Sequence, residues 1–400
     1  MEVMEVMEVP KELCNYTPYS PEVLEAVCYT SFMLITLSCI LGLVGNAVVI
    51  AVTGFIMKRK NSQIWFLNLA VADFCFSLLL GIYAHYIFTE NWQFGSYLCK
   101  ISNYTSTCNM YVSVFIITAL TIDRVLSVAK PIWHHKNFSV RFCCWICAAI
   151  WILTALVSLP VLLLSDEIQY GDKMHCRIVI AKPSYAHNIH KRDLNDSLEY
   201  YHVSKEYSYN FSGVVNSSET KHAMPGIIIS FPMTKLNPIY TFQKIKNATI
   251  TIYCTVNLRE LRDTAFSTGC IVIPCIVLGY FIPLAVILVS NLIIAQQGGK
   301  SQSVKSPRLY RIIIMIVLFF FLTWTPLITA QIILLAALYS ENVILMYKMY
   351  WVMPLVSSIA FSNSCINPII YVLVGTQARK ALSDFMSTRL SFLSGTQRSG

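Results

Sequence analysis

Residues 26–57 read AVCYTSFMLITLSCILGLVGNAVVIAVTGFIM, a stretch without a charged side chain that ends at Lys58, Arg59 and Lys60. A helix needs about 20 apolar residues to cross the ~30 Å hydrocarbon core of a bilayer, so this stretch is long enough to span a membrane. Hydrophobic residues make up 56% of the chain and charged residues only 13%, about half the share usual in soluble domains. Lipid is therefore the expected solvent, which excludes a soluble enzyme, a coiled coil and a disordered chain.

Six more apolar stretches of similar length follow along the chain. They lie between Lys60 and Glu90, Lys100 and Lys130, Arg141 and Asp166, Asp263 and Lys300, Arg311 and Glu341, and Lys348 and Arg379. The sequence therefore predicts an all-α membrane protein, a bundle of seven transmembrane helices over residues 27–375. A long polar loop of about 166–264 interrupts the bundle, residues 1–26 precede it, and residues 376–400 follow it.

The charges beside the spans predict how the chain is oriented. The connections after the first, third and fifth spans are rich in Lys and Arg, whereas residues 1–26 hold six Glu against one Lys. Positive charge marks the cytoplasmic side, so we predict a multi-pass plasma-membrane protein with an extracellular N-terminus and a cytoplasmic tail. The formal net charge of +9 comes without a basic face, so nucleic-acid binding is not expected.

The outer segments carry few signals of regular structure. The opening MEVMEVMEV repeat is interpreted as a disordered acidic leader, and two β-prone pieces of the long loop, GIIIS and ATITIYCTV, are predicted to pair as a hairpin. Five N-x-S/T motifs on the predicted outer side are expected to be glycosylated: Asn15, Asn195, Asn210, Asn216 and Asn247. Asn103 and Asn137 also begin such motifs but fall in a span and on the inner side, so they should stay unmodified.

Cysteines on the outer side are expected to pair. Cys99 opens the third span and Cys176 lies about ten residues past the fourth, so a disulfide between them would tie the long loop to the third span. Cys14 and Cys254 are candidates for a second bridge. Cys143, Cys144 and Cys147, near the inner end of the fourth span, are expected to stay reduced as core residues.

Histidines give no metal-binding pattern. His187 and His190 fall in the long loop, and His134 and His135 are expected to face the cytosol. The chain also lacks a catalytic triad, a phosphate-binding loop and a HExxH motif, so we expect no enzyme activity and no cofactor.

Polar residues inside the spans are the strongest functional signal, because an ionisable group in hydrocarbon is costly unless it is paired or hydrated. Asp73 is the clearest case, and the polar residues at similar depth in other spans are Asn46, Asn109, Ser113, Asn363 and Asn367. A carboxylate with converging amide and hydroxyl oxygens would suit a small hard cation. From spacing alone, a purely structural hydrogen-bond network is an equal alternative.

Several short motifs, in this order, resemble the rhodopsin-like (class A) G protein-coupled receptors. They are Gly45-Asn46, LAVAD at 69–73, Cys99, DRV at 123–125, Trp151 with Pro160, FLTWTP at 321–326 and NSCINPIIY at 363–371. The resemblance covers roughly residues 27–386 and leaves out the N-terminal segment and most of the long loop. It implies that residues 376–386 form a short amphipathic eighth helix, that the partners are a heterotrimeric G protein and arrestin, and that the protein sits in membrane lipid.

The resemblance also implies roles for individual residues. Asp123 should hold Arg124 in the inactive state and release it to the G protein in the active state. The remaining switch residues would be Phe320, Trp324, Pro326, Asn367, Pro368 and Tyr371. The family's allosteric sodium pocket would consist of Asp73, Asn109, Ser113, Asn363 and Asn367, so the resemblance favours the cation over the purely structural network.

Within the family, the chain is most similar to chemoattractant peptide receptors of the anaphylatoxin, chemerin and formyl-peptide types. VTGFIMKRKNSQIWFLNLAVADF at 52–74 carries much of this similarity. It implies an extracellular peptide or small-protein ligand, an inhibitory-class G protein, and a role in chemotaxis and inflammation. The ligand's end would enter near His85, Tyr104, Ser106, Tyr111 and Gln331.

Three departures from this group keep other functions open. Cys275 and Met353 replace an arginine and an aspartate of the C3a receptor, and Asn291 replaces a tyrosine that stabilises the active state in most members. The alternatives are an atypical ligand-scavenging receptor with weak G-protein coupling and a receptor for a lipid mediator of the prostaglandin type.

Overall fold

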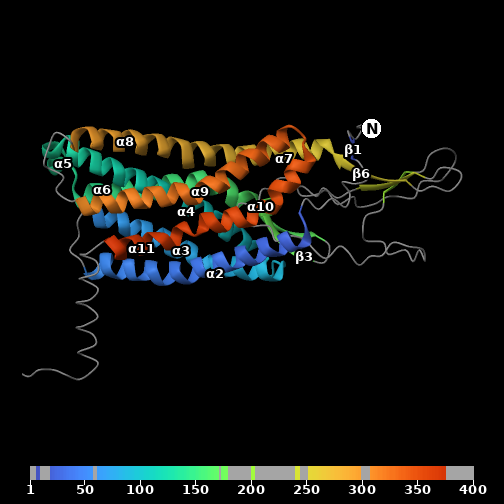
Figure 1. The fold of residues 1–400 in the computed structure, drawn as a ribbon, viewed down its shortest axis with the longest axis horizontal. Helices are drawn as coiled ribbons and strands as arrows, with labels where there is room; N and C mark the ends of the chain where they lie inside the picture. Colours follow the sequence, from blue (N-terminus) through green and yellow to red (C-terminus); the bar gives the residue numbers. More distant parts are fainter. Residues whose placement is uncertain are drawn as a thin grey trace, which may run out of the picture.

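The computed structural model describes residues 6–9, 19–56, 61–170, 173–178, 200–202, 239–243, 251–298 and 307–374. In this part of the chain, seven helical spans run side by side as one elongated bundle (Figure 1). The helices are α2 (Pro21–Ala51), α3 (Asn61–Thr89), α4 (Gly95–Ala129), α6 (Val140–Leu164), α7 (Leu258–Ile276) with α8 (Ile282–Gly298), α9 (Pro307–Tyr339), and α10 (Val343–Phe361) with α11 (Asn363–Val374). The predicted seven-helix membrane fold is confirmed.

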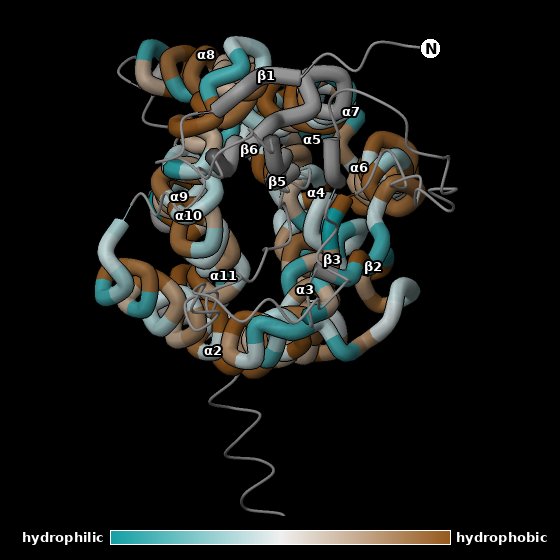
Figure 2. The backbone as a smooth tube through the Cα atoms, turned by 90° about the vertical axis from the view of Figure 1, so that its right-hand side faces the viewer, coloured by the Kyte–Doolittle hydropathy of each residue, from teal (hydrophilic) through white to brown (hydrophobic). Residues whose placement is uncertain are grey.

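The surface of the bundle suits lipid. Viewed along the bundle axis, the helices form a ring with many hydrophobic residues (Figure 2). Large apolar side chains on the outer faces are well exposed, among them Leu156 at 63%, Leu163 at 68% and Leu322 at 68%. In water such a surface would drive aggregation, whereas in a bilayer it meets acyl chains.

Prolines lie in or at the start of helices of the last four spans. Pro160, Pro326 and Pro368 lie inside α6, α9 and α11. Pro283 lies at the start of α8, directly after one turn of π-helix, η2 (Val277–Phe281). Proline has no N–H to donate and its ring crowds the carbonyl four residues earlier, so the wider π turn relieves that clash.

A β-hairpin marks one end of the bundle, called here the hairpin end. Strands β2 (Ser165–Tyr170) and β3 (Lys173–Ile178) pair antiparallel directly after α6. A disulfide joins Cys176 on β3 to Cys99 at the start of α4, which confirms the predicted bridge. The backbone N–H of Trp92 also donates to the carbonyl of Met174 at 2.8 Å. The hairpin is thus fastened to the start of α4 and to the connection between α3 and α4.

A second, four-stranded sheet has the order β1–β6–β5–β4, formed by β1 (Val6–Val9), β6 (Thr251–Asn257), β5 (Ile239–Gln243) and β4 (Tyr200–His202). The expectation of a disordered leader is wrong for Val6–Val9, because these residues pair with β6. The expected partner of ATITIYCTV is wrong as well, since β1 and β5 occupy both edges of β6. The GIIIS stretch lies outside the described residues.

The opposite end of the bundle carries the seven-residue helix α5 (Pro131–Asn137) and is called here the α5 end. Two side-chain hydrogen bonds connect α3 to the following helices. The Trp151 indole of α6 donates to Asn68 Oδ1 at 3.0 Å, and the Asn61 amide donates to the Phe138 carbonyl at 2.9 Å. Both contacts tie α3 to the α5–α6 segment.

Candidate functional site

The centre of the bundle contains a buried carboxylate with two amide partners. Asp73 on α3 is fully buried, and its two oxygens accept hydrogen bonds from the amides of Asn109 on α4 and Asn367 on α11, each at 2.8 Å. The hydroxyl of Ser364 donates to Asn109 Oδ1 at 3.3 Å. Three spans therefore meet at one carboxylate. Ser364 was not predicted as part of this group, although it lies inside the NSCINPIIY motif.

The other residues of the predicted sodium pocket lie on the same helix faces. Ser113 is four residues after Asn109, and Asn363 is four residues before Asn367, so each lies one turn from a partner of Asp73. Both are buried, and the Ser113 hydroxyl and the Asn363 amide oxygen find no hydrogen-bond partner within the described residues. A buried carboxylate with unpartnered hydroxyl and amide oxygens one turn away fits a small hard cation.

Asn46 joins the first span to this region. Its amide donates to the carbonyls of Gly42 and Ser364, both at 2.9 Å. Next to it, Gly45 approaches α11 so closely that a Cβ placed there would lie 2.7 Å from Pro368 Cβ. The Gly45-Asn46 pair therefore permits and fixes the contact between α2 and the proline of α11.

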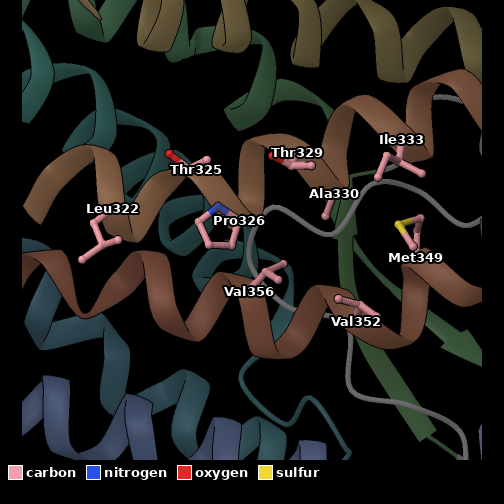
Figure 3. Close-up of a pocket in the computed structure, with 9 residues that line it drawn as sticks. All are labelled: Leu322, Thr325, Pro326, Thr329, Ala330, Ile333, Met349, Val352 and Val356. Atoms are coloured by element: carbon pink, nitrogen blue, oxygen red, sulfur yellow. The ribbon is translucent and has the colours of Figure 1, made fainter.

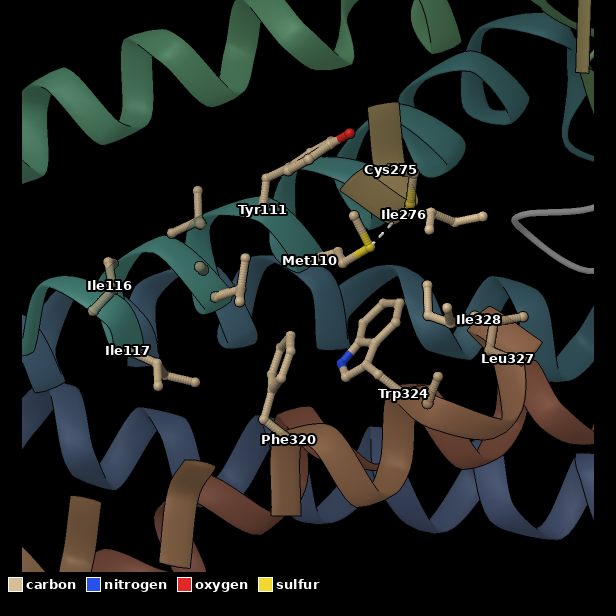
Figure 4. Packing of buried hydrophobic residues seen from close by; sticks show 14 of the residues in the cluster. Met110, Tyr111, Ile116, Ile117, Cys275, Ile276, Phe320, Trp324, Leu327 and Ile328 are labelled. Carbon is tan, nitrogen blue, oxygen red and sulfur yellow. Dashed lines mark hydrogen bonds between the residues drawn. The ribbon is translucent and has the colours of Figure 1, made fainter. Parts of the chain in front are cut away.

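Towards the hairpin end, the predicted switch residue Trp324 lies in a cluster of buried side chains. Trp324 stacks on Phe320 with ring centroids 5.8 Å apart, and both are buried. Met110 on α4 and Cys275 on α7 lie beside Trp324, and the Cys275 thiol is 3.4 Å from the Met110 sulfur (Figure 4). We call Met110, Cys275 and Trp324 the floor.

Above the floor, three helices present buried polar groups. Ser106 lies one turn from Met110, Thr268 two turns from Cys275, and Gln331 two turns from Trp324, each on the same helix face and towards the hairpin end. All three are 1% exposed, and their side-chain oxygens, with the Gln331 amide nitrogen, have no hydrogen-bond partner in the part of the chain described. This polar layer has hydrogen-bonding capacity but no charge. Buried polar atoms left without a partner are costly, which marks the layer as a place for a ligand or water.

The remaining predicted pocket residues point elsewhere or lie at the rim. The Tyr104 hydroxyl donates to the Ala155 carbonyl on α6 at 3.3 Å. Tyr111 is buried against Phe115, with centroids 5.7 Å apart. His85 is exposed and meets the Phe94 ring edge-on at 5.3 Å. The polar layer thus includes Ser106 and Gln331 of the predicted set, whereas Thr268 was missed because a single threonine in an apolar span carries no distinctive signal.

The β2–β3 hairpin carries charged side chains that contact residues in or beside neighbouring helices. The Arg177 guanidinium donates to the Tyr350 hydroxyl at 2.5 Å and lies 5.5 Å from that ring's centroid. Lys173 pairs with Glu90 at 2.6 Å. Buried His175 contacts the Tyr86 hydroxyl at 2.9 Å through Nδ1. Burial, helped by the neighbouring Arg177 and Lys173, lowers the pKa of His175 from 6.5 to about 4, so this imidazole is neutral near pH 7.

At the α5 end, Asp123 is fully buried and has two partners. Arg124 forms an ion pair with one carboxylate oxygen, as predicted. His134 on α5 lies 2.6 Å from the other oxygen through Nε2. This contact of His134 was not predicted from the sequence. No sequence signal distinguished it from exposed His135, because the contact depends on how α5 docks against α4.

The remaining predicted switch residues lie in helices of the sixth and seventh spans. Pro326 lies within α9 and Pro368 within α11, and the backbone of Tyr371 belongs to α11. Cys143 and Cys147 are buried as expected, but Cys144 is exposed on the outer face of α6, so its assignment to the core is wrong. The eighth helix, Cys14 and the glycosylation motifs at Asn15, Asn195, Asn210, Asn216 and Asn247 lie outside the described residues. Asn103 is 1% exposed, in keeping with an unmodified side chain.

A cavity of about 480 Å³ lies between α9 and α10 (Figure 3). Its lining is almost wholly apolar: Leu322, Thr325, Pro326, Thr329, Ala330, Ile333, Met349, Val352 and Val356. Because Leu322, Thr325 and Thr329 are exposed on the outer face of α9, the cavity opens sideways toward lipid rather than into the polar layer.

Comparisons with known proteins agree with this arrangement. The model of the "7 transmembrane receptor (rhodopsin family)" matches residues 45–192 and 224–371, well over half of the chain. The chain is 28% identical to Chemerin-like receptor 1 of Mus musculus over 352 residues, which covers 87% of the chain and 76% of the relative. It is 28% identical to the Homo sapiens receptor of that name, covering 89% and 78%. It is 26% identical to the C3a anaphylatoxin chemotactic receptor of Rattus norvegicus, covering 88% and 86%. The chain therefore belongs to the rhodopsin family of seven-transmembrane receptors, and within that family it is similar to chemerin-like and C3a receptors.

Proposed function

We propose that the protein is a plasma-membrane receptor for an extracellular chemoattractant peptide or small protein, and that it signals through an inhibitory-class heterotrimeric G protein. In this proposal the N-terminus and the hairpin end face outward, and the α5 end meets the G protein, with arrestin as a later partner. The relatives' names support the ligand class, because they refer to chemerin and to C3a. The Lys and Arg residues after the first, third and fifth spans support the orientation.

The observation that carries the proposal is a series of buried polar and aromatic groups spaced along the bundle from the hairpin end to the α5 end. The polar layer lies above Trp324 and the floor, the Asp73 network links α3, α4 and α11, and the Asp123–Arg124 pair closes the α5 end. A ligand that binds better when the α5 end is open shifts a pre-existing equilibrium towards that state. Ligand binding at one end can thereby free Arg124 at the other.

The chemistry of the polar layer limits which part of a ligand can enter. Ser106, Thr268 and Gln331 offer neutral donors and acceptors, and Cys275 stands where the C3a receptor has an arginine. A charged ligand end would lose its hydration there without a compensating charge, which costs several kcal/mol. An apolar, hydrogen-bonding end suits the layer better. A carboxylate would instead suit Arg177 on the hairpin.

The sodium pocket remains a proposal that the donor set supports. Asp73 would supply the charge, and the Ser113, Asn363 and Asn367 oxygens would complete the ligands, because none of these three oxygens has a partner within the described chain. A bound cation would neutralise the carboxylate and hold α3, α4 and α11 in the closed arrangement.

A second candidate function is a ligand-scavenging receptor with weak G-protein coupling. The observation that favours it is Asn291 on α8, which replaces the family's tyrosine. Its amide oxygen is buried and unpartnered among the described residues. A shorter side chain at this position cannot make the tyrosine's contact in the open state.

The deciding experiment measures cyclic AMP and ligand uptake side by side in cells expressing the chain. The cells would be challenged separately with C3a, C3a lacking its terminal arginine, the chemerin C-terminal peptide and formylated peptides. Lowered cyclic AMP with one ligand, lost in Arg124→Ala while surface binding persists, supports the proposal. Uptake of a labelled ligand without a cyclic AMP response supports the scavenger. No binding of any ligand contradicts both peptide readings and directs the search to lipid mediators.

A further inference from the structure

His134 is the second partner of the most buried carboxylate at the α5 end. The Asp123 side chain is fully buried, and its two oxygens are taken by different elements: Oδ2 by Arg124 of α4 itself and Oδ1 by His134 of α5, at 2.6 Å. The His134 side chain is 16% exposed, so solvent reaches this contact only partly. The ion pair that restrains Arg124 is therefore attached directly to α5.

The surroundings hold the His134 ring in place. It stacks on Phe138 with centroids 4.7 Å apart and an interplanar angle of 16°. Phe138 in turn packs edge-on against Phe142, and its carbonyl accepts the amide of Asn61 at 2.9 Å. An isolated helix of seven residues is not stable in water, so such contacts decide where α5 sits.

We propose that His134 is a positioning residue for G-protein activation: it couples α5 to Asp123, so that release of Arg124 and movement of α5 occur together. The inference rests on the proposed function, because it assigns the α5 end to the G protein. In addition to contacting the G protein, α5 then takes part in the restraint on Arg124.

The expected direction of the effect follows from the burial of Asp123. Removing the His134 donor leaves a buried carboxylate oxygen without a partner, and this penalty falls on the closed arrangement. When the α5 end opens, Asp123 gains access to water and the penalty disappears. Loss of the donor therefore favours the open state and raises activity in the absence of ligand. A lost hydrogen bond to a charged group corresponds to a change of about tenfold in this equilibrium.

Three variants separate the contributions of His134. His134→Phe keeps a ring to stack on Phe138 but has no donor. His134→Gln keeps a donor near the position of Nε2 but has no ring to stack on Phe138. His135→Phe, the matched control, makes the same change at the exposed neighbour. The measurements are basal nucleotide exchange on a purified inhibitory-class G protein by receptor in nanodiscs, and amide hydrogen exchange of residues 131–137.

We expect His134→Phe to raise basal nucleotide exchange about tenfold over His135→Phe and to speed amide exchange in α5. His134→Gln should fall between them, because its amide restores a donor to the Asp123 carboxylate. Equal basal activity and equal amide exchange in His134→Phe and His135→Phe would overturn the inference. If wild type and all variants drive no nucleotide exchange, the proposed function fails. The amide exchange of α5 then still decides whether His134 positions this helix.

Discussion

Replacing Gly45 with alanine tests the close contact between α2 and α11. A Cβ at this position would lie 2.7 Å from Pro368 Cβ and 3.0 Å from Pro368 Cγ. Carbon atoms pack at about 3.5–4.0 Å, so the methyl group is close to 1 Å too near on one side. The pyrrolidine ring cannot rotate away, and the helices must separate instead. Overpacking of this kind costs about 1–3 kcal/mol.

Gly81→Ala is the matched control for this prediction. It makes the same change in a helical span, but its Cβ would meet only Cys39 Sγ at 3.8 Å, an ordinary contact. Alanine favours a helix over glycine by about 1 kcal/mol at either site, so the difference between the two variants isolates the clash. The assay is the thermal unfolding midpoint of receptor in nanodiscs. We expect Gly45→Ala to unfold below both wild type and Gly81→Ala. Equal midpoints for the two variants would refute the packing argument.

Three further perturbations test other parts of the structure. Asp73→Asn removes the charge of the proposed sodium pocket. The unfolding midpoint of wild type should be higher in sodium chloride than in N-methylglucamine chloride, whereas the midpoint of the variant should be the same in both salts. A sodium effect that persists in the variant would place the cation elsewhere. Because the pKa of His175 is about 4 when folded and 6.5 when unfolded, the unfolded chain binds more protons between these values, and acidification from pH 6.5 to 4 should remove up to about 3 kcal/mol of stability. Midpoints measured at pH 7.5 and 5 should fall less in His175→Gln, and an equal fall would contradict this assignment. Replacing both Cys99 and Cys176 by alanine removes a disulfide between residues 77 apart in sequence, which should lower the free energy of unfolding by about 4 kcal/mol. The unfolding midpoint under non-reducing conditions should fall accordingly. An unchanged midpoint would show that the hairpin is held by its other contacts.

Sequence patterns predicted the architecture because hydrocarbon imposes strict requirements. A span must be long and apolar, so uncharged runs located all seven spans. A buried charge must have partners, so Asp73 pointed to polar residues in other spans. The structure joins it to Asn109 and Asn367, both of which were predicted. These inferences need only the depth of a residue in its span, and the residue number along the span gives that depth.

The misses share a different physical origin. His134 and adjacent His135 have the same chemistry, and only the docking of α5 brings one of them to Asp123. The family resemblance placed Tyr104 in the ligand pocket, but the rotation of α4 turns its hydroxyl to α6. The pairing of Val6–Val9 with β6 joins segments some 245 residues apart. Rotation, docking and long-range pairing are set by tertiary packing, which a local pattern does not report.

The measurement that tests the central claim most directly is ligand-driven nucleotide exchange by the purified receptor in nanodiscs. Wild type and Arg124→Ala would be compared on an inhibitory-class heterotrimeric G protein with the peptide that lowers cyclic AMP in cells, and labelled-peptide binding would be measured on the same samples. We expect wild type to accelerate exchange, and Arg124→Ala to bind the peptide without accelerating exchange. Exchange that persists in Arg124→Ala, or peptide binding to wild type without exchange, would contradict the central claim.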